Sequence, residues 1–228
     1  MWVKICANTN LDDAKLAAEL GADALGFVFA AASSRRMTPE QVAPIVQELP
    51  ESIEKVGVFA ELDLAAIRAA VEYAGLTGVQ LHGDYTPELI LGLRKGLSTP
   101  VTILQTLHWQ VTAGLEQAEA FEASTRRIAE DGLAARLLVD AKTASASGGT
   151  GTAFDWNLAR ASFEIARRGM PIILAGGLRP ENVAEAIRTL RPWGVDVASG
   201  VESAPGKKDP EKLQAFITNA RQAERNGA

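Results

Sequence analysis

Two titratable residues, Cys6 and Asp140, stand at the ends of short apolar runs and could supply an acid and a base. Cys6 closes a run in which Lys4 lies two residues earlier, on the same pleat face if that run is a strand. A neighbouring ammonium lowers the pKa of a thiol, which would make Cys6 a nucleophile or a base. Partial burial would raise the pKa of Asp140 toward that of a general acid. The plainer interpretations are that Cys6 is a packed core thiol and that Asp140 forms a salt bridge with Lys142 or another neighbour.

Histidine and arginine side chains follow two further apolar runs. His82 ends one run, where a substrate contact and a structural hydrogen bond are both open interpretations. Arg35 and Arg36 lie after another, where one guanidinium could bind a substrate carboxylate through two hydrogen bonds. Because the chain holds two histidines and one cysteine, we expect no metal-ligand cluster and no metal. Walker, G-x-S-x-G and H-E-x-x-H motifs are absent from the sequence.

Glycines end two consecutive apolar runs near the C-terminus. Gly176 and Gly177 follow one run, and Ser199 and Gly200 follow the next. Glycine lets backbone N–H groups approach an anion closely, and a helix that begins beyond the turn adds a favourable dipole. Either pair alone would more simply make a tight turn, but the two together predict a phosphate site. A glycine-rich loop at 147–152 is long enough to close over a ligand.

These residues are positioned by an alternation of short apolar runs with longer amphipathic segments. The runs are of the kind buried on both faces of a parallel sheet. The predicted strands are 3–6, 24–29, 55–59, 78–82, 101–107, 136–140, 171–174 and 195–198. Helix starts are predicted where Thr38 precedes Pro39 and Gln41, and where Asp209 precedes a proline. Further starts are predicted at Asn10, Asp155 and Arg179, and a helix is expected within 114–128.

Eight strand–helix units in 228 residues predict one (β/α)8 TIM barrel, an α/β fold that spans residues 1–228 as a single domain. At about 28 residues per unit this is near the minimal size of such a barrel. The rival is an open doubly wound sheet, which usually has a glycine-rich first turn that this chain lacks. In a barrel, functional groups follow the C-terminal ends of the strands. That rule places Cys6, Arg35, His82 and Asp140 at the catalytic rim, and Asp23 at the opposite, stabilising rim.

The composition limits the partners and the compartment. With 23 basic and 28 acidic residues the net charge is −5, which gives no general attraction to nucleic acid or to an anionic membrane. One cysteine excludes an internal disulfide. The N-terminal run is too short for a signal peptide, and no apolar run has the roughly 18 residues of a spanning helix. A cytoplasmic protein is expected, with a monomer and a homodimer both open.

Sequence blocks along the whole chain resemble the phosphoribosylanthranilate isomerases, barrel enzymes of tryptophan biosynthesis. In the first half they are VKIC at 3–6, GADALGFVF at 21–29, SSR at 33–35, TPE at 38–40, VGVF at 56–59 and VQLHG at 79–83. In the second half they are LLVD at 137–140, GGTG at 148–151 with FDW at 154–156, AGGL at 175–178 with PENV at 180–183, VDVASGVE at 195–202 and PGKKD at 205–209.

The resemblance implies an Amadori rearrangement of N-(5-phosphoribosyl)anthranilate to 1-(o-carboxyphenylamino)-1-deoxyribulose 5-phosphate, without a cofactor. By position, Asp140 matches the family's general acid and Cys6 its general base. Arg35 matches an arginine near the anthranilate carboxylate, and Asp196 an acidic residue near the substrate. The substrate phosphate is expected at Gly176, Gly177, Ser199 and Gly200.

The chain departs from the family pattern at several positions. Ala7 stands where the family usually has glycine, Arg36 where an aromatic residue is common, and Gln105-Thr106 where Lys/Arg-Ala is frequent. Two alternatives are therefore kept. One is an isomerase of a related phosphorylated aminoaldose, and the other is a barrel that binds a phosphosugar without catalysis.

Overall fold

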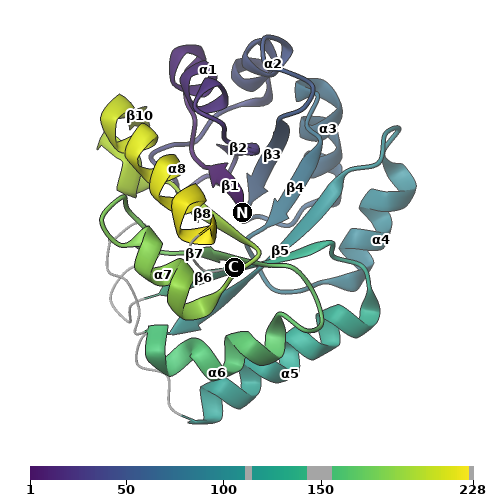
Figure 1. Ribbon diagram of the computed structural model, residues 1–228. Coiled ribbons are helices and arrows are strands. Elements are labelled where there is room, and N and C mark those ends of the chain that lie inside the picture. The colour runs from purple at the N-terminus through teal and green to yellow at the C-terminus, as the bar shows by residue number, and fades with distance from the viewer. Residues whose placement is uncertain (111–114, 143–155, 226–228) are drawn as a thin grey trace.

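The strands close on themselves into a parallel barrel. The computed structural model describes residues 1–110, 115–142 and 156–225, and within them eight strands pair in consecutive order, with β8 returning to β1. This is a (β/α)8 TIM barrel, as predicted (Figure 1). The barrel strands are β1 (Trp2–Ile5), β2 (Ala24–Val28), β3 (Glu54–Phe59), β4 (Gly78–Leu81), β5 (Thr102–Gln110), β6 (Arg136–Lys142), β7 (Ile172–Ala175) and β8 (Gly194–Val197).

The helices form a ring outside the strands (Figure 1). They are α1 (Leu11–Glu19), α2 (Pro39–Gln47), α3 (Leu64–Ala74), α4 (Pro87–Gly96), α5 (Leu115–Asp131), α6 (Trp156–Ala166), α7 (Val183–Leu190) and α8 (Pro210–Arg225). A 3-10 turn η1 (Ser199–Val201) and a small hairpin, β9 (Glu202–Ala204) with β10 (Lys207–Lys208), lie between β8 and α8.

Capping side chains start the helices close to where the sequence predicts. Asn10 Oδ1 accepts a hydrogen bond from the N–H of Asp13 at 2.9 Å, and Asp209 Oδ1 accepts one from Glu211 at 3.0 Å. These bonds satisfy N–H groups that a helix leaves unpaired at its first turn. The helix expected near Arg179 begins later, at Val183, because the intervening residues form a turn. Asp155 and the loop at 147–152 lie outside the described residues.

Alternate strand residues face two separate cores. The barrel interior is filled by one cluster: Trp2, Ala24, Val56, Leu104, Leu138, Ile173 and Ala175. The other strand face packs against the helices in a larger cluster that includes Val3, Phe27, Leu81 and Phe216. Because side chains alternate along a strand, residues two or four positions beyond the interior cluster also face inward.

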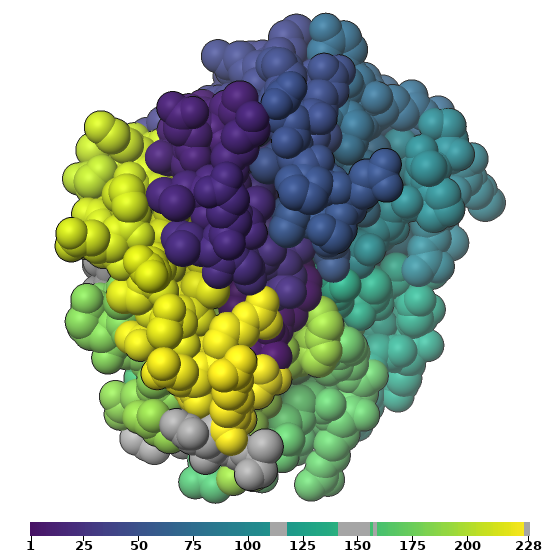
Figure 2. Space-filling model, turned by 45° about the horizontal axis from the view of Figure 1, so that its top comes forward, coloured from purple at the N-terminus to yellow at the C-terminus, as the bar shows by residue number. Residues whose placement is uncertain are grey.

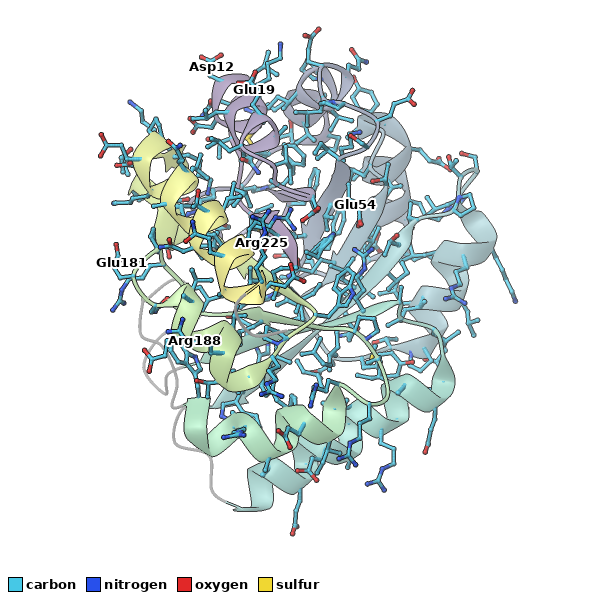
Figure 3. The ribbon with its side chains drawn as sticks, in the orientation of Figure 1. Asp12, Glu19, Glu54, Glu181, Arg188 and Arg225 are labelled. Atoms are coloured by element: carbon cyan, nitrogen blue, oxygen red, sulfur yellow. The ribbon has the colours of Figure 1, made fainter. Side chains whose placement is uncertain are left out.

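The N-terminal rim of the barrel is a layer of ion pairs and aromatic rings. Arg136 donates to Glu54 through both terminal nitrogens, at 2.7 and 2.8 Å, and its guanidinium lies over the rings of Trp2 and Trp193. Figure 3 shows Glu54 inside the ring of helices, where β3 begins. Asp23 accepts from Val3 N–H at 2.7 Å, so at this rim it ties strands together, as expected. These groups stabilise the barrel and leave the opposite rim for chemistry.

The two chain ends meet at this rim. The α-amino group of Met1 pairs with Glu224, and Arg221 donates to the backbone oxygens of Met1 and Gly21 and to the carboxylate of Asp23. Figure 2 shows the C-terminal helix in yellow against the N-terminal segment in purple. Among the described residues, every helix is too short or too polar to cross a bilayer.

Candidate active site

The C-terminal rim carries polar side chains at inward-facing strand positions. Lys4 and Asp196 are register partners on β1 and β8, and His108 and Asp140 are register partners on β5 and β6. Cys6 lies one residue beyond β1, two residues after Lys4. The alternation of side chains therefore directs all of these groups toward the barrel mouth.

Cys6 belongs to a buried triad with Lys4 and Asp196. The Lys4 side chain is fully buried, and its Nζ lies 2.7 Å from Asp196 Oδ1. The ammonium also interacts with the Cys6 thiol. Burial lowers the pKa of Lys4, but attraction to Asp196 and to Cys6 outweighs it, so the pKa of Lys4 is raised. Lys4 is therefore charged and is shared between a carboxylate and a thiol.

The resting state of Cys6 differs from the sequence expectation. Burial raises the pKa of the thiol, Lys4 lowers it, and Asp196 raises it again, with a net shift upward. The expected effect of Lys4 is present, but burial outweighs it. Because Cys6 is only 7% exposed as a residue, water offers the thiolate little solvation. Cys6 is thus a protonated thiol at neutral pH, beside a cation that would stabilise its anion.

Gly26 leaves room for the Cys6 side chain, and the backbone bends at Ala7 directly after it. A Cβ at Gly26 would lie 2.7 Å from Cys6 Sγ and 3.1 Å from Lys4 Cε, so only glycine leaves the thiol and the lysine in place. Ala7 has φ 61°, in the left-handed region that disfavours side chains. Asn8 supports this bend, donating from Nδ2 to the oxygens of Ile5 and Gly26 at 2.8 and 3.2 Å.

Arg35 reaches the same rim but is held by a carboxylate. Its Nε and Nη2 donate to Glu202 at 2.8 and 2.6 Å, and Glu202 is nearly buried. Burial raises the pKa of Glu202, but hydrogen bonds from Arg35 and the charge of Lys208 outweigh it, and the pKa is lowered. Glu202 is therefore an anion that fixes the guanidinium. The sequence analysis missed this partner, which lies 167 residues away in the chain.

Lys208 is a second residue that the sequence analysis missed. Its fully buried Nζ donates to the backbone oxygens of Cys6 at 2.6 Å and Ala198 at 3.3 Å, and lies 3.4 Å from Glu202 Oε1. Burial lowers the pKa of Lys208, and the nearby anions oppose that shift only in part. Lys208 thus joins the end of β1 to the turn after β8. The sequence feature that could have pointed to Lys208 is the block PGKKD, which contains two adjacent lysines.

Asp140 lies beside two histidines. His82 Nε2 is 3.9 Å from Asp140 Oδ2, and the rings of His82 and His108 meet edge to face with centroids 4.9 Å apart. The side chains of His82 and Asp140 are 30% and 14% exposed, so both reach the solvent of the mouth. This arrangement corrects the expectation that no metal-ligand cluster exists, because the count of histidines and cysteines left out the aspartate. The side chain of Lys142 lies outside the described residues.

The two glycine turns are in direct contact. Gly176 and Gly177 have φ 87° and 65°, which glycine adopts without strain. A Cβ at Gly200 would lie 1.9 Å from the oxygen of Leu178, so the turn after β8 packs against the turn after β7 with no room for a side chain. Asn182, a further residue missed from sequence, holds the first turn by donating to Gly177 O at 3.0 Å and accepting from Arg179 N–H at 2.9 Å. Two adjacent backbone turns can present several N–H groups to one anion.

Comparisons with known proteins agree on one family. The family model described as N-(5'phosphoribosyl)anthranilate (PRA) isomerase matches residues 3–219. An N-(5'-phosphoribosyl)anthranilate isomerase of Pelobacter propionicus is 42% identical over 220 residues, which cover 96% of this chain and 95% of that protein. One of Trichlorobacter lovleyi is 41% identical over 221 residues, or 97% and 98% of the two chains.

Solved structures give the same result. The phosphoribosyl anthranilate isomerase of Thermotoga maritima superimposes with a TM-score of 0.82 at 36% identity, covering 97% of this chain and 99% of that one. A second structure, an isomerase in complex with reduced 1-(o-carboxyphenylamino)-1-deoxyribulose 5-phosphate, gives 0.79 at 34% identity with the same coverage. The chain therefore belongs to the N-(5'-phosphoribosyl)anthranilate isomerase family, intramolecular oxidoreductases of tryptophan biosynthesis.

Proposed function

We propose that Cys6 and Asp140 are the general base and general acid of the isomerase reaction in this chain. The observation that carries the proposal is their placement on inward-facing positions at the C-terminal rim, separated around the barrel by β7 and β8. Cys6 has a cation at its side, and Asp140 is open to solvent at the mouth. A substrate that spans the mouth would meet a proton donor at one end of its sugar and a base at the other.

The reaction proceeds by two proton transfers. Asp140, protonated, gives its proton to the furanose ring oxygen of N-(5'-phosphoribosyl)anthranilate, and the bond between C1′ and that oxygen breaks to leave an iminium ion. Cys6, as a thiolate, removes the proton from C2′, and the electron pair of that bond neutralises the iminium to give an enol. The enol tautomerises to the ketone. The iminium is the electron sink that acidifies C2′.

Lys4 supports the base step electrostatically. The thiol must lose its proton before it acts, and its raised pKa makes that loss unfavourable in the resting enzyme. Lys4 is the cation that stabilises the thiolate once it forms, and Asp196 holds Lys4 in place at 2.7 Å. A positively charged iminium that forms next to Cys6 would favour the thiolate further.

We assign substrate binding to three side chains and two turns. Arg35 uses Nε and Nη2 on Glu202, so the anthranilate carboxylate would meet Nη1. His82 and Asp196 would contact the sugar from either side of the mouth. The phosphate would bind the backbone N–H groups of the touching turns, at Gly176, Gly177, Ser199 and Gly200. Support for this comes from the contact between Gly200 and the turn after β7.

The test is the loss of anthranilate-type fluorescence when the pure protein meets substrate generated in situ. Cys6→Ser and Asp140→Asn should each lose about 10²- to 10⁴-fold in kcat, the usual contribution of a positioned acid or base. Both should still bind the reduced product analogue. Asp84→Asn, which removes an exposed carboxylate of the same rim, is the matched control and should keep full activity. Full activity in Cys6→Ser would contradict the assignment.

We further propose that residues 1–228 form one cooperative domain that acts in the cytoplasm as a monomer or a homodimer. Urea unfolding followed by fluorescence and by circular dichroism should give coincident transitions. Two separate transitions would contradict the single domain. Sedimentation velocity decides between monomer and dimer, and cell fractionation tests the compartment.

A further inference from the structure

Three possible metal ligands come together on neighbouring strands. One ligand atom each from His82, His108 and Asp140 can be chosen so that all three lie within 4.8 Å of one another. The residues come from the end of β4, from β5 and from β6, which are adjacent in the barrel. Two imidazoles and a carboxylate are the donor set of many Zn²⁺ sites, in which a fourth position stays open to water or substrate.

The backbone holds these residues in place. His108 and Asp140 are register partners on β5 and β6, so their side chains leave the sheet side by side and on the same face. His82 is fixed by its N–H, which donates to Phe59 O at 2.8 Å. Gly83, the residue after His82, is also held, because Gln105 Nε2 donates a hydrogen bond to its backbone oxygen at 2.8 Å. Only side-chain rotation is then needed to adjust the ligand atoms.

The distances are compatible with a metal after a small movement. Zn²⁺ binds imidazole nitrogen and carboxylate oxygen at about 2.0–2.2 Å, which puts the ligands of a tetrahedral site about 3.3–3.5 Å apart. His82 Nε2 and Asp140 Oδ2 are already 3.9 Å apart. Movements on the order of 1 Å would therefore close the set around an ion. All three side chains are partly exposed, so an ion can reach them from solvent.

We propose that His82, His108 and Asp140 bind a divalent transition-metal ion of the Zn²⁺ class, and that the bound ion inhibits the isomerase. The inhibition rests on the proposed role of Asp140 as general acid. A carboxylate that coordinates a metal is held deprotonated, so it has no proton to give to the ring oxygen. His108 is the residue that completes the set, and neither the family resemblance nor the proposed reaction gives it a role.

The binding test uses Co²⁺ in place of Zn²⁺, because its visible bands report on its coordination. Protein stripped with a chelator should bind one Co²⁺ per chain with d–d bands of a four- or five-coordinate site, and Zn²⁺ should displace it. His108→Gln should weaken binding by at least about 100-fold, since even outer-shell changes cost 10–100-fold. Asp84→Asn, which removes an exposed carboxylate two residues from His82, should bind as the wild type does.

Cys6→Ser separates this site from one built on the thiol. The variant should keep the same visible spectrum, and the wild type should show no near-ultraviolet charge-transfer band of a thiolate–cobalt bond. A charge-transfer band that Cys6→Ser abolishes would overturn the proposal. Unchanged affinity in His108→Gln would overturn it as well.

Inhibition by the bound ion is tested by activity measurements that do not depend on the Co²⁺ spectra. Zn²⁺ should inhibit the wild type at the concentrations at which it displaces Co²⁺, a chelator should restore the rate, and His108→Gln should resist the ion. If Co²⁺ bound without inhibiting the reaction, the inhibitory role would be refuted, whereas the metal site itself would be supported. Failure of the proposed reaction would appear as no turnover in metal-free protein, with the Co²⁺ spectrum intact.

Discussion

The pair of Lys4 and Asp196 gives the sharpest test of how the site is held. The change is a double-mutant cycle of Lys4→Met, Asp196→Asn and the two together. Methionine keeps most of the length of the lysine side chain, and asparagine keeps the shape of the carboxylate. The singles leave one buried charge without its partner, whereas the double variant removes both charges.

The magnitude follows from the geometry. The side chains are 0% and 10% exposed, and the charged atoms are 2.7 Å apart. At an effective dielectric constant of about 20 that separation gives roughly 6 kcal/mol of attraction, against a desolvation cost of several kcal/mol. Removal of one partner of such a pair costs about 3–5 kcal/mol. Each single variant should therefore lose that amount from a total stability of about 5–15 kcal/mol, and the double variant should lose about 1 kcal/mol or less.

The assay is urea unfolding at pH 7, with the free energy of unfolding extrapolated to water. An exposed pair is the control: Lys15 Nζ lies 2.9 Å from Glu48 Oε2, but the side chains are 41% and 58% exposed. Lys15→Met should cost less than about 1 kcal/mol, because solvent screens that pair. If the two buried singles were additive, with a coupling below about 0.5 kcal/mol, the argument from burial would be wrong.

Three further predictions concern the site. Because burial raises the pKa of Cys6, the thiol should titrate above its ordinary range, measured as the ultraviolet absorbance of the thiolate that the wild type gains and Cys6→Ser does not. In Lys4→Met, which removes the cation that lowers the thiol pKa, this titration should move to still higher pH, and a wild-type thiol that titrates at or below its ordinary pKa would contradict the argument from burial. Gly200→Ala places a methyl group against the backbone oxygen of Leu178, so it should raise KM and lower the free energy of unfolding by about 1–3 kcal/mol. If both values stayed unchanged, the two turns would not be packed as closely as the structure shows. Ala7→Gly removes about 1–2 kcal/mol of backbone strain at φ 61°, but it also removes a buried methyl group and raises the conformational entropy of the unfolded chain. These effects oppose each other, so the free energy of unfolding measured by calorimetry should stay within about 1 kcal/mol of the wild type. A loss of more than about 2 kcal/mol would contradict this reasoning.

The fold was largely readable from the sequence because its signals are local. Apolar runs located all eight strands to within a few residues, and β5 was the least accurate, since it continues to Gln110 where 101–107 was predicted. Its extension is stabilised by pairing with β6 through Gln110 and Lys142, a contact between distant residues. The helix expected within 114–128 is found at Leu115–Asp131. Local patterns place elements, whereas their ends depend on partners across the sheet.

The site was less readable because its properties arise from distant partners and burial. The pairing of Arg35 with Glu202 and the contacts of Lys208 join segments far apart in the chain. The net shift of the Cys6 pKa depends on burial, which a list of neighbours in sequence does not contain. The cluster of His82, His108 and Asp140 was missed because a count of histidines and cysteines leaves out the aspartate. The assignments of base, acid, substrate and phosphate residues stay predictions until the variants are measured.

The seam between β1 and β8 has a consequence for synthesis on the ribosome. Lys4 leaves the exit tunnel long before Asp196, its partner 192 residues later, is made. Until then the first strand presents an open hydrogen-bonding edge and a lysine without its counterion. The nascent chain therefore cannot pair Lys4 with Asp196, or shield that edge, until β8 (Gly194–Val197) has emerged. A chain that stops before β8 would keep both the open edge and the unpaired lysine, and an open strand edge is prone to pair with other chains.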